Sequence, residues 1–202
     1  MQIPVLMFLA LLVGQSSAII NYYLESYCNG YSWPIDMSIL DTVRLRLTSS
    51  LRYNNNMNCS VSLTTSSSKQ LMYYFRSFDV ENSDSCQYDF LEMHDGTSLR
   101  APYANGFYGK QCGSYVDPFV YTTSNSALTL WFKSDNSNTG KGFDMIITSY
   151  HTGICDPDEY SCSNGRCVEN YLTCNGYNPC GDHSDCALTV GGIAGIAVGS
   201  VC

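Results

Sequence analysis

The residue with the clearest chemical potential is Asp89, which stands in the stretch CQYDFLEMHDG between Cys86 and Gly96. The stretch reads as a strand and ends in Asp95-Gly96, a dipeptide that is typical of turns. A charge is unfavourable inside a sheet unless another group pairs with it. Asp89 is therefore either an accident of the surface or half of a site.

The sequence offers no set of residues that could perform catalysis. The histidines His94, His151 and His183 are scattered and have neither metal-ligand nor catalytic-triad spacing. We find no Gly-x-Ser-x-Gly, no His-Glu-x-x-His and no glycine loop that could hold a phosphate. Catalysis needs an activated nucleophile or base with an orienting partner, so we predict a protein without enzymatic activity.

The N-terminus and the cysteine content both predict export. Residues 1–18 contain an apolar run followed by small residues, with Ser16 and Ala18 suited to cleavage, which is the form of a secretory signal peptide. The chain has eleven cysteines, and disulfides persist in secreted proteins. Because eleven is odd, at least one cysteine has no partner within the chain.

The charge is unevenly distributed and excludes nucleic acid as a partner. Residues 28–150 carry eleven acids against nine bases, whereas residues 155–186 carry six acids against one base, Arg166. Binding phosphates requires a basic face, which neither segment provides. The acidic segment instead favours cations, either metal ions or lysine-rich partners.

Alternating apolar residues predict an all-β protein. Val43, Leu45 and Leu47 share one face of a strand-like run, and the same period of two recurs in LTLWF and FDMII. Polar breakers such as YNNNMN and SDNSNTGKG separate these runs. We therefore predict a β-sandwich over residues 28–150, followed by a disulfide-rich module over residues 155–186, which is too short to fold around a core alone.

The C-terminal residues 187–202 form an uncharged apolar tail, for which there are three interpretations. As a helix the tail would reach about 24 Å, less than the ~30 Å of a bilayer core. Gly191, Gly195 and Gly199 have the spacing that lets membrane helices approach closely. We favour a truncated transmembrane segment, with Cys202 as the odd cysteine, over a secreted tail or a GPI signal.

Residues 28–150 resemble a CUB domain. The motifs that carry the resemblance are YNNNMNC (53–59), YYFRSFDVE (73–81), CQYDFLEMHDG (86–96), Cys112-Gly113, Pro118 and LTLWFKSDNSNTGKGF (128–143). They cover most of the segment in the family's order. The resemblance implies a compact β-sandwich with the disulfides Cys28–Cys59 and Cys86–Cys112.

The same resemblance implies a calcium site that includes Asp89. Many CUB domains hold calcium through three acids, which correspond here to Glu81, Asp89 and Asp135. The resemblance also places the carbonyl of Ser137 and Asn138 near the ion, with Tyr53 supporting the acids. Calcium takes six to eight oxygen ligands, so backbone carbonyls and water can complete the set. In this family an acid beside the ion receives a basic side chain from a protein partner.

Residues 155–186 resemble a low-density lipoprotein receptor class A repeat (LDL-A). The cysteine spacing carries the resemblance, which implies the disulfides Cys155–Cys167, Cys162–Cys180 and Cys174–Cys186. An EGF module would need a Cys-x-Cys motif, and a zinc site would need Cys-x-x-Cys pairs. Both motifs are absent from the sequence. Asp182, Ser184 and Asp185 fit the family's calcium pattern, but Leu172, Asn175 and Pro179 depart from it. We therefore expect a disulfide-held spacer or a weak binding face.

These features predict an extracellular or cell-surface protein that binds an extracellular protein partner through a calcium-bearing CUB domain. The alternative is the non-catalytic N-terminal part of a larger secreted or membrane-bound protease. The sequon Asn58-Cys59-Ser60 adds a possible glycan, although disulfide formation by Cys59 competes with glycosylation.

Overall fold

The computed structural model describes residues 19–28, 33–115 and 119–186. The expected signal peptide (1–18), Pro118 and the apolar tail with Cys202 lie outside the described residues. Within those three ranges, no helix has both the length and the apolar character that a membrane span requires.

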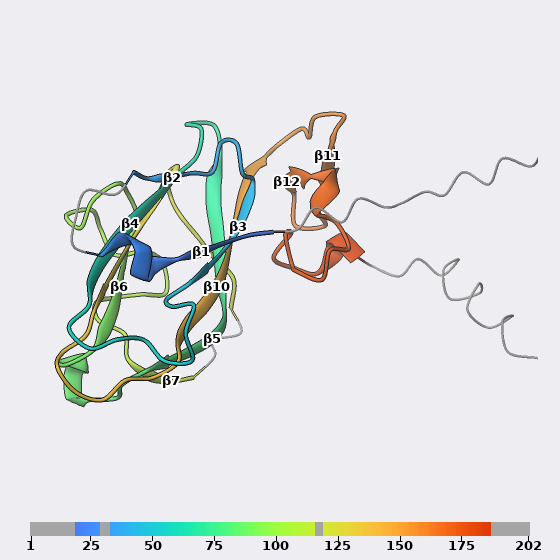
Figure 1. Ribbon diagram of the computed structural model, residues 1–202. Helices are drawn as coiled ribbons and strands as arrows, with labels where there is room; N and C mark the ends of the chain where they lie inside the picture. The colour runs from blue at the N-terminus through green and yellow to red at the C-terminus, as the bar shows by residue number, and fades with distance from the viewer. Residues whose placement is uncertain (1–18, 29–32, 116–118, 187–202) are drawn as a thin grey trace, which may run out of the picture.

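Two mostly antiparallel sheets pack face to face and form a sandwich (Figure 1). The first sheet has the order β1 (Ile20–Tyr23), β3 (Thr42–Arg46), β10 (Gly142–Thr152) and β5 (Gln70–Val80), and the short strands β7 (Gly113–Ser114) and β8 (Tyr121–Thr122) pair with β5. The second sheet has the order β2 (Ile35–Asp36), β4 (Asn58–Thr64), β9 (Ala127–Lys133) and β6 (Phe90–His94). Strands β1 and β2 run parallel to their neighbours.

The core lies between the two sheets and contains the alternating apolar residues of the sequence. Leu45 on β3, Leu130 on β9 and Ile147 on β10 are fully or almost fully buried, as the period of two requires for strands with one inward face. Two short 3₁₀ helices, η1 (Leu24–Tyr27) and η2 (Asp84–Cys86), lie in the connections. The predicted all-β class is confirmed.

Two details differ from the sequence-based expectations. Strand β1 precedes Cys28 and pairs with β3, so the sandwich includes residues before the expected start at residue 28. Asp89 lies just before β6 rather than inside a strand, because Tyr88 and Asp89 form a bend and the strand begins at Phe90. The acid is therefore at the end of the sheet, where a loop can approach it.

A small module follows β10 and consists of the hairpin β11 (Glu159–Ser161) and β12 (Arg166–Glu169) with the 3₁₀ helices η3 (Asn170–Leu172) and η4 (Ser184–Cys186). Five disulfides join cysteines in the described residues: Cys28–Cys59 and Cys86–Cys112 in the sandwich, and Cys155–Cys167, Cys162–Cys180 and Cys174–Cys186 in the small module. The small module has few apolar residues, so its three disulfides provide the stability that a larger domain obtains from its hydrophobic core.

The small module is docked on the sandwich through a shared strand and a shared apolar cluster. The end of β10 pairs with β12, His151 opposite Cys167. Met72 and Tyr150 of the sandwich form a buried cluster with Cys162, Val168 and Cys180 of the small module. Such a cluster removes apolar surface of both parts from water and therefore favours one fixed arrangement.

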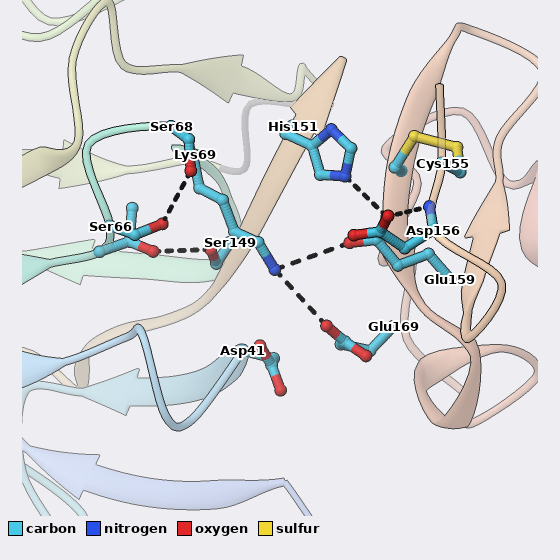
Figure 2. A network of polar contacts seen from close by, with 12 residues as sticks. Asp41, Ser66, Ser68, Lys69, Ser149, His151, Cys155, Asp156, Glu159 and Glu169 are labelled. Atoms are coloured by element: carbon cyan, nitrogen blue, oxygen red, sulfur yellow. Dashed lines mark hydrogen bonds and ion pairs between the residues drawn. A yellow bond between two sulfur atoms is a disulfide. The ribbon is translucent and has the colours of Figure 1, made fainter. Parts of the chain in front are cut away.

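Polar contacts complete this junction, as Figure 2 shows. Lys69 lies 3.4 Å from Glu169 and 3.7 Å from Glu159, and His151 Nε2 lies 2.6 Å from the Glu159 carboxylate. Burial opposes ionisation of Glu159, but hydrogen bonds from the Asp156 backbone and His151 outweigh it and lower its pKa. Glu159 is therefore a buried anion held between two modules.

We predict that Lys69→Met loosens the docking of the small module. Exposed ion pairs contribute at most about 1 kcal/mol, but the Glu159 side chain is only 4% exposed, and a partly buried carboxylate that loses its cation costs more. Backbone amides of β12 should exchange hydrogen about tenfold faster at pH 7. Lys133→Met, at an exposed position on β9, is the matched control. Equal exchange rates in the two variants would show that the ion pairs do not hold the junction.

Candidate metal centre

Three acids from three chain segments meet at one end of the sandwich. Glu81 directly follows β5, Asp89 directly precedes β6, and Asp135 lies two residues after β9. Because Phe90 pairs with Lys133, the start of β6 and the end of β9 coincide. One carboxylate oxygen from each of the three acids lies within 4.8 Å of the others. The strand ends thus gather carboxylates that are far apart in sequence.

Asp89 is the centre of this cluster and is 0% exposed. Its Oδ2 accepts a hydrogen bond from the Tyr53 hydroxyl at 2.6 Å, and its Oδ1 accepts one from the Asp135 backbone N–H at 2.8 Å. Burial raises the pKa of Asp89 and outweighs these two bonds, and the nearby charges of Glu81 and Asp135 raise it further. The ionised form of Asp89 therefore needs an additional positive charge to be favourable.

Tyr53 links the acids to the core of the sandwich. Its ring is 2% exposed and packs edge-on against Phe132, with ring centroids 5.1 Å apart. Its hydroxyl donates to Asp89 and accepts the backbone N–H of Glu81 at 3.0 Å. Burial raises the pKa of this phenol, so the hydroxyl remains a donor at neutral pH. Tyr53 thereby fixes the positions of two of the three acids.

The loop after β9 supplies the remaining predicted residues. Asp135 Oδ1 accepts hydrogen bonds from the backbone N–H of Ser137 at 2.8 Å and from its hydroxyl at 3.3 Å. Asn138 has a positive φ of 37° and donates from Nδ2 to Glu81 Oε1 at 2.9 Å. The positive φ turns the Asn138 side chain back toward the acids, a conformation that asparagine tolerates better than most residues. Tyr53, Glu81, Asp89, Asp135, Ser137 and Asn138 thus belong to one connected group.

The donor set at this end fits a calcium ion. Glu81 Oε2 is buried without a hydrogen-bond partner, and an unpaired buried carboxylate oxygen is costly. Among the described residues, no lysine, arginine or histidine forms an ion pair with Glu81, Asp89 or Asp135. Three clustered carboxylates without a basic partner are hard oxygen donors of the kind that calcium prefers.

The sequence-based prediction missed the residues that hold the two loops of the cluster together. The Asn56 backbone N–H donates to the carbonyl of Asp135, and Asn55 Nδ2 donates to the carbonyl of Asn136 at 2.9 Å. Arg52 also donates to the carbonyl of Thr139. The run of asparagines in YNNNMN was the available signal, because asparagine side chains commonly bond to loop backbone.

The acids of the small module are arranged differently. Asp182 Oδ1 accepts hydrogen bonds from the backbone and the hydroxyl of Ser184, and Asp185 Oδ2 accepts the backbone N–H of Cys174. Leu172 is buried. Within the described part of the chain, neither Asp182 nor Asp185 gathers with two further potential ligands. Asp182 caps a local turn, and Asp185 instead connects two segments of the module that are eleven residues apart.

A second group of potential ligands, His151, Glu159 and Cys167, lies at the junction of the modules. Cys167 is joined to Cys155, so its sulfur is a disulfide sulfur and not a thiolate. Thiolate is the form in which cysteine binds metals. This group is therefore a structural contact and not a metal site.

The predicted glycosylation residue Asn58 is exposed at the start of β4. Its Oδ1 accepts a hydrogen bond from Trp131 Nε1 at 2.7 Å, while Cys59 is buried in its disulfide with Cys28. The amide nitrogen to which a glycan would be attached is not the atom that Trp131 contacts. Glycosylation of Asn58 stays a prediction.

Relatives of known identity share only part of their length with this chain. Cubilin of Rattus norvegicus is 31% identical over 183 residues, which is 79% of this chain and 5% of that protein. Abnormal cell migration protein 13 of Caenorhabditis elegans is 30% identical over 152 residues, or 66% of this chain and 42% of that protein. The chain therefore spans less than half the length of these relatives.

Family models and a solved structure complete the comparison. A crystal structure of the MASP-1 CUB2 domain bound to Ca2+ is similar at 20% identity, covers 54% of this chain and 92% of that one, and has a TM-score of 0.45. The model of the low-density lipoprotein receptor domain class A matches residues 153–187. The CUB domain model matches residues 44–146, about half of the chain. The chain thus belongs to the CUB domain family, and an LDL-A domain follows its CUB domain.

Proposed function

We propose that this chain is a non-enzymatic binding protein whose CUB domain recognises an extracellular protein partner in a calcium-dependent manner. CUB and LDL-A domains are extracellular, non-catalytic protein-interaction modules that commonly bind calcium. The observation that carries the proposal is the cluster of Glu81, Asp89 and Asp135, whose ligand oxygens lie within 4.8 Å without a basic partner. Calcium would supply the positive charge that this cluster needs.

The residues around the cluster have distinct roles in this proposal. Asp89, fixed by Tyr53 and by the backbone of Asp135, would provide the buried ligand. Glu81 and Asp135 are only partly buried, so they can face both the ion and the solvent. Ser137 and Asn138, which already contact the two outer acids, would contribute further oxygens. Binding would therefore order the loops after β5 and β9 together.

A partner with a basic side chain fits this end of the sandwich. Carboxylate oxygens that are held in place form short, charge-assisted hydrogen bonds with lysine or arginine. Glu81 and Asp135 are the acids that can reach such a side chain, since Asp89 is fully buried. Because the three acids repel one another without a cation, we infer that recognition of the partner depends on calcium.

The alternative function is that of a non-catalytic N-terminal part of a larger secreted or membrane-bound protease. The suppressor of tumorigenicity 14 protein homolog of Bos taurus is 29% identical over 137 residues, which is 14% of that protein. A non-catalytic CUB and LDL-A pair is compatible with both readings. Sequencing the transcript beyond the Cys202 codon distinguishes them, because a protease domain there would favour the alternative.

Calcium titration of the secreted chain by calorimetry tests the proposed site. We expect one site with a dissociation constant on the order of 10⁻⁴–10⁻³ M or tighter. Asp89→Asn removes the buried charge at nearly constant volume, so it should weaken binding by about tenfold or more. Asp84→Asn, at an exposed acid in η2 outside the cluster, is the matched control and should leave the affinity unchanged. A well-folded wild-type chain that binds no calcium would refute the assignment.

The raised pKa of Asp89 predicts how calcium binding responds to pH. A protonated carboxyl is a poor calcium ligand, so protons and calcium compete for Asp89. Because burial raises the pKa of Asp89 above its ordinary value of 3.8, calcium affinity should fall as the pH is lowered, and the fall should begin at a higher pH than for an ordinary aspartate. The same raised pKa means that the calcium-free protein loses stability as the pH rises from the ordinary value of 3.8 toward the raised pKa of Asp89. Thermal unfolding at a series of pH values from 7.4 down to 4, with and without calcium, measures both trends, and a calcium-induced shift of equal size at every pH would contradict them.

A further inference from the structure

The junction of the two modules contains a cleft that neither module has alone. The cleft has a volume of about 260 Å³, and its walls come from β5 of the CUB domain and from the loops of the LDL-A domain. The residues that matter here are Tyr74, Arg76, Tyr177, Asn178 and His183. The cleft exists because β10 pairs with β12 and the shared apolar cluster fixes the LDL-A domain in place.

Arg76 brings a positive charge to this cleft that its neighbours compensate only in part. The neighbouring carboxylate of Asp144 is already bound by Arg44, whose Nε and Nη2 donate to its two oxygens at 2.8 and 2.5 Å. Arg76 Nη1 lies 3.8 Å from the same carboxylate, too far for a hydrogen bond. Within the described residues Arg76 donates no hydrogen bond, and its side chain is 42% exposed. Two arginines thus share one aspartate, and the second retains its donors.

The LDL-A domain orients this guanidinium. The Arg76 guanidinium carbon lies 5.3 Å from the centre of the Tyr177 ring, which holds the group by a cation–π contact. Tyr74 accepts the backbone N–H of Asn178 at 3.1 Å, so its own proton is available to a ligand. Burial raises the pKa of Tyr74, which keeps that proton in place at neutral pH. His183 is exposed on the same wall.

We propose that this junction cleft is a binding site for a carboxylate of an acidic partner segment, an aspartate or glutamate side chain. An oriented guanidinium fork and a phenol proton match the two oxygens of a carboxylate. The acids nearby are already engaged, since Asp144 is bound by Arg44 and Asp185 accepts the Cys174 backbone N–H. The chain has a formal net charge of −8, so most of its surface repels anions. A site that attracts an anion therefore depends on the local arrangement of these residues.

The cleft is separate from the calcium centre. Arg76 and Glu81 lie on and just after the same strand, five residues apart, which corresponds to about 17 Å of extended chain. The cleft has the opposite charge preference, so the two sites would contact different residues of a partner. Its existence does not depend on calcium binding, and each site can fail without the other.

Nuclear magnetic resonance titration of the whole chain in calcium-free buffer tests the cleft. The probes are the N-acetyl, N-methylamide derivatives of aspartate and of asparagine, which differ in charge but hardly in shape. We expect the aspartate probe to shift the amide signals of Gly176, Asn178 and His183 with millimolar affinity, and the asparagine probe to leave them unchanged. Equal shifts from both probes, or none, would overturn the proposal.

Three variants identify the group responsible. Arg76→Gln should abolish the aspartate-specific shifts, whereas Arg76→Lys, which keeps the charge but loses the fork, should weaken the affinity by about threefold to tenfold. Arg100→Gln, at an exposed arginine in another loop, should leave them as in the wild type. Unchanged amide signals in the remote strands β4 and β9 establish that the variants fold. Wild-type affinity in Arg76→Gln would show that Arg76 does not bind the probe.

Discussion

The buried carboxylate of Asp89 is the constraint on which the functional end of the CUB domain depends. A carboxylate without solvent contact requires partners, and Asp89 has the Tyr53 hydroxyl on one oxygen and the Asp135 backbone N–H on the other. These two bonds connect the loop before β4, the start of β6 and the loop after β9. Glu81 joins them through its own backbone bond to Tyr53. The bonds position Asp89 but do not neutralise it, so the geometry that orders the loops also creates the demand for a cation.

Strand β10 fixes the orientation of the LDL-A domain relative to the CUB domain. In the sandwich this strand lies between β3 and β5 and pairs with both. Its last two residues extend beyond them and pair with β12. A short domain with three disulfides and few apolar residues is not obliged to have one orientation relative to its neighbour. Here Met72 and Tyr150 give it an apolar surface to cover, and Arg166 lies over the Tyr150 ring at 4.9 Å. The connection is therefore part of the fold and not a flexible tether.

The fold could be predicted from the sequence because its signals are local. Alternation of apolar residues such as Leu128, Leu130 and Phe132 requires only neighbouring positions, and it gave the strands. Glu81, Asp89 and Asp135 could be proposed as a cluster only through the CUB resemblance, since no spacing rule brings together residues that are 54 positions apart. The junction between the domains could be predicted neither from local sequence patterns nor from the family resemblance. Lys69, Arg76 and His151 have ordinary surface types, and their roles follow from the docking angle, which no local pattern encodes. The one available hint was that Arg166 is the single base of an acidic segment.

The distribution of basic residues explains how an acidic LDL-A domain can lie against the CUB domain at all. Both parts have an excess of acids, so long-range electrostatics alone would separate them. Of the ten lysines and arginines in the chain, four lie at or beside the junction: Arg44, Lys69, Arg76 and Arg166. Lys69 and Arg166 hold the domains together, the first through Glu159 and Glu169 and the second through the Tyr150 ring and Met72 Sδ. Arg44 is bound by Asp144, which leaves Arg76 as the member of this group whose charge faces the cleft. The attraction that assembles the two domains and the positive charge of the cleft thus have a common origin in this concentration of bases.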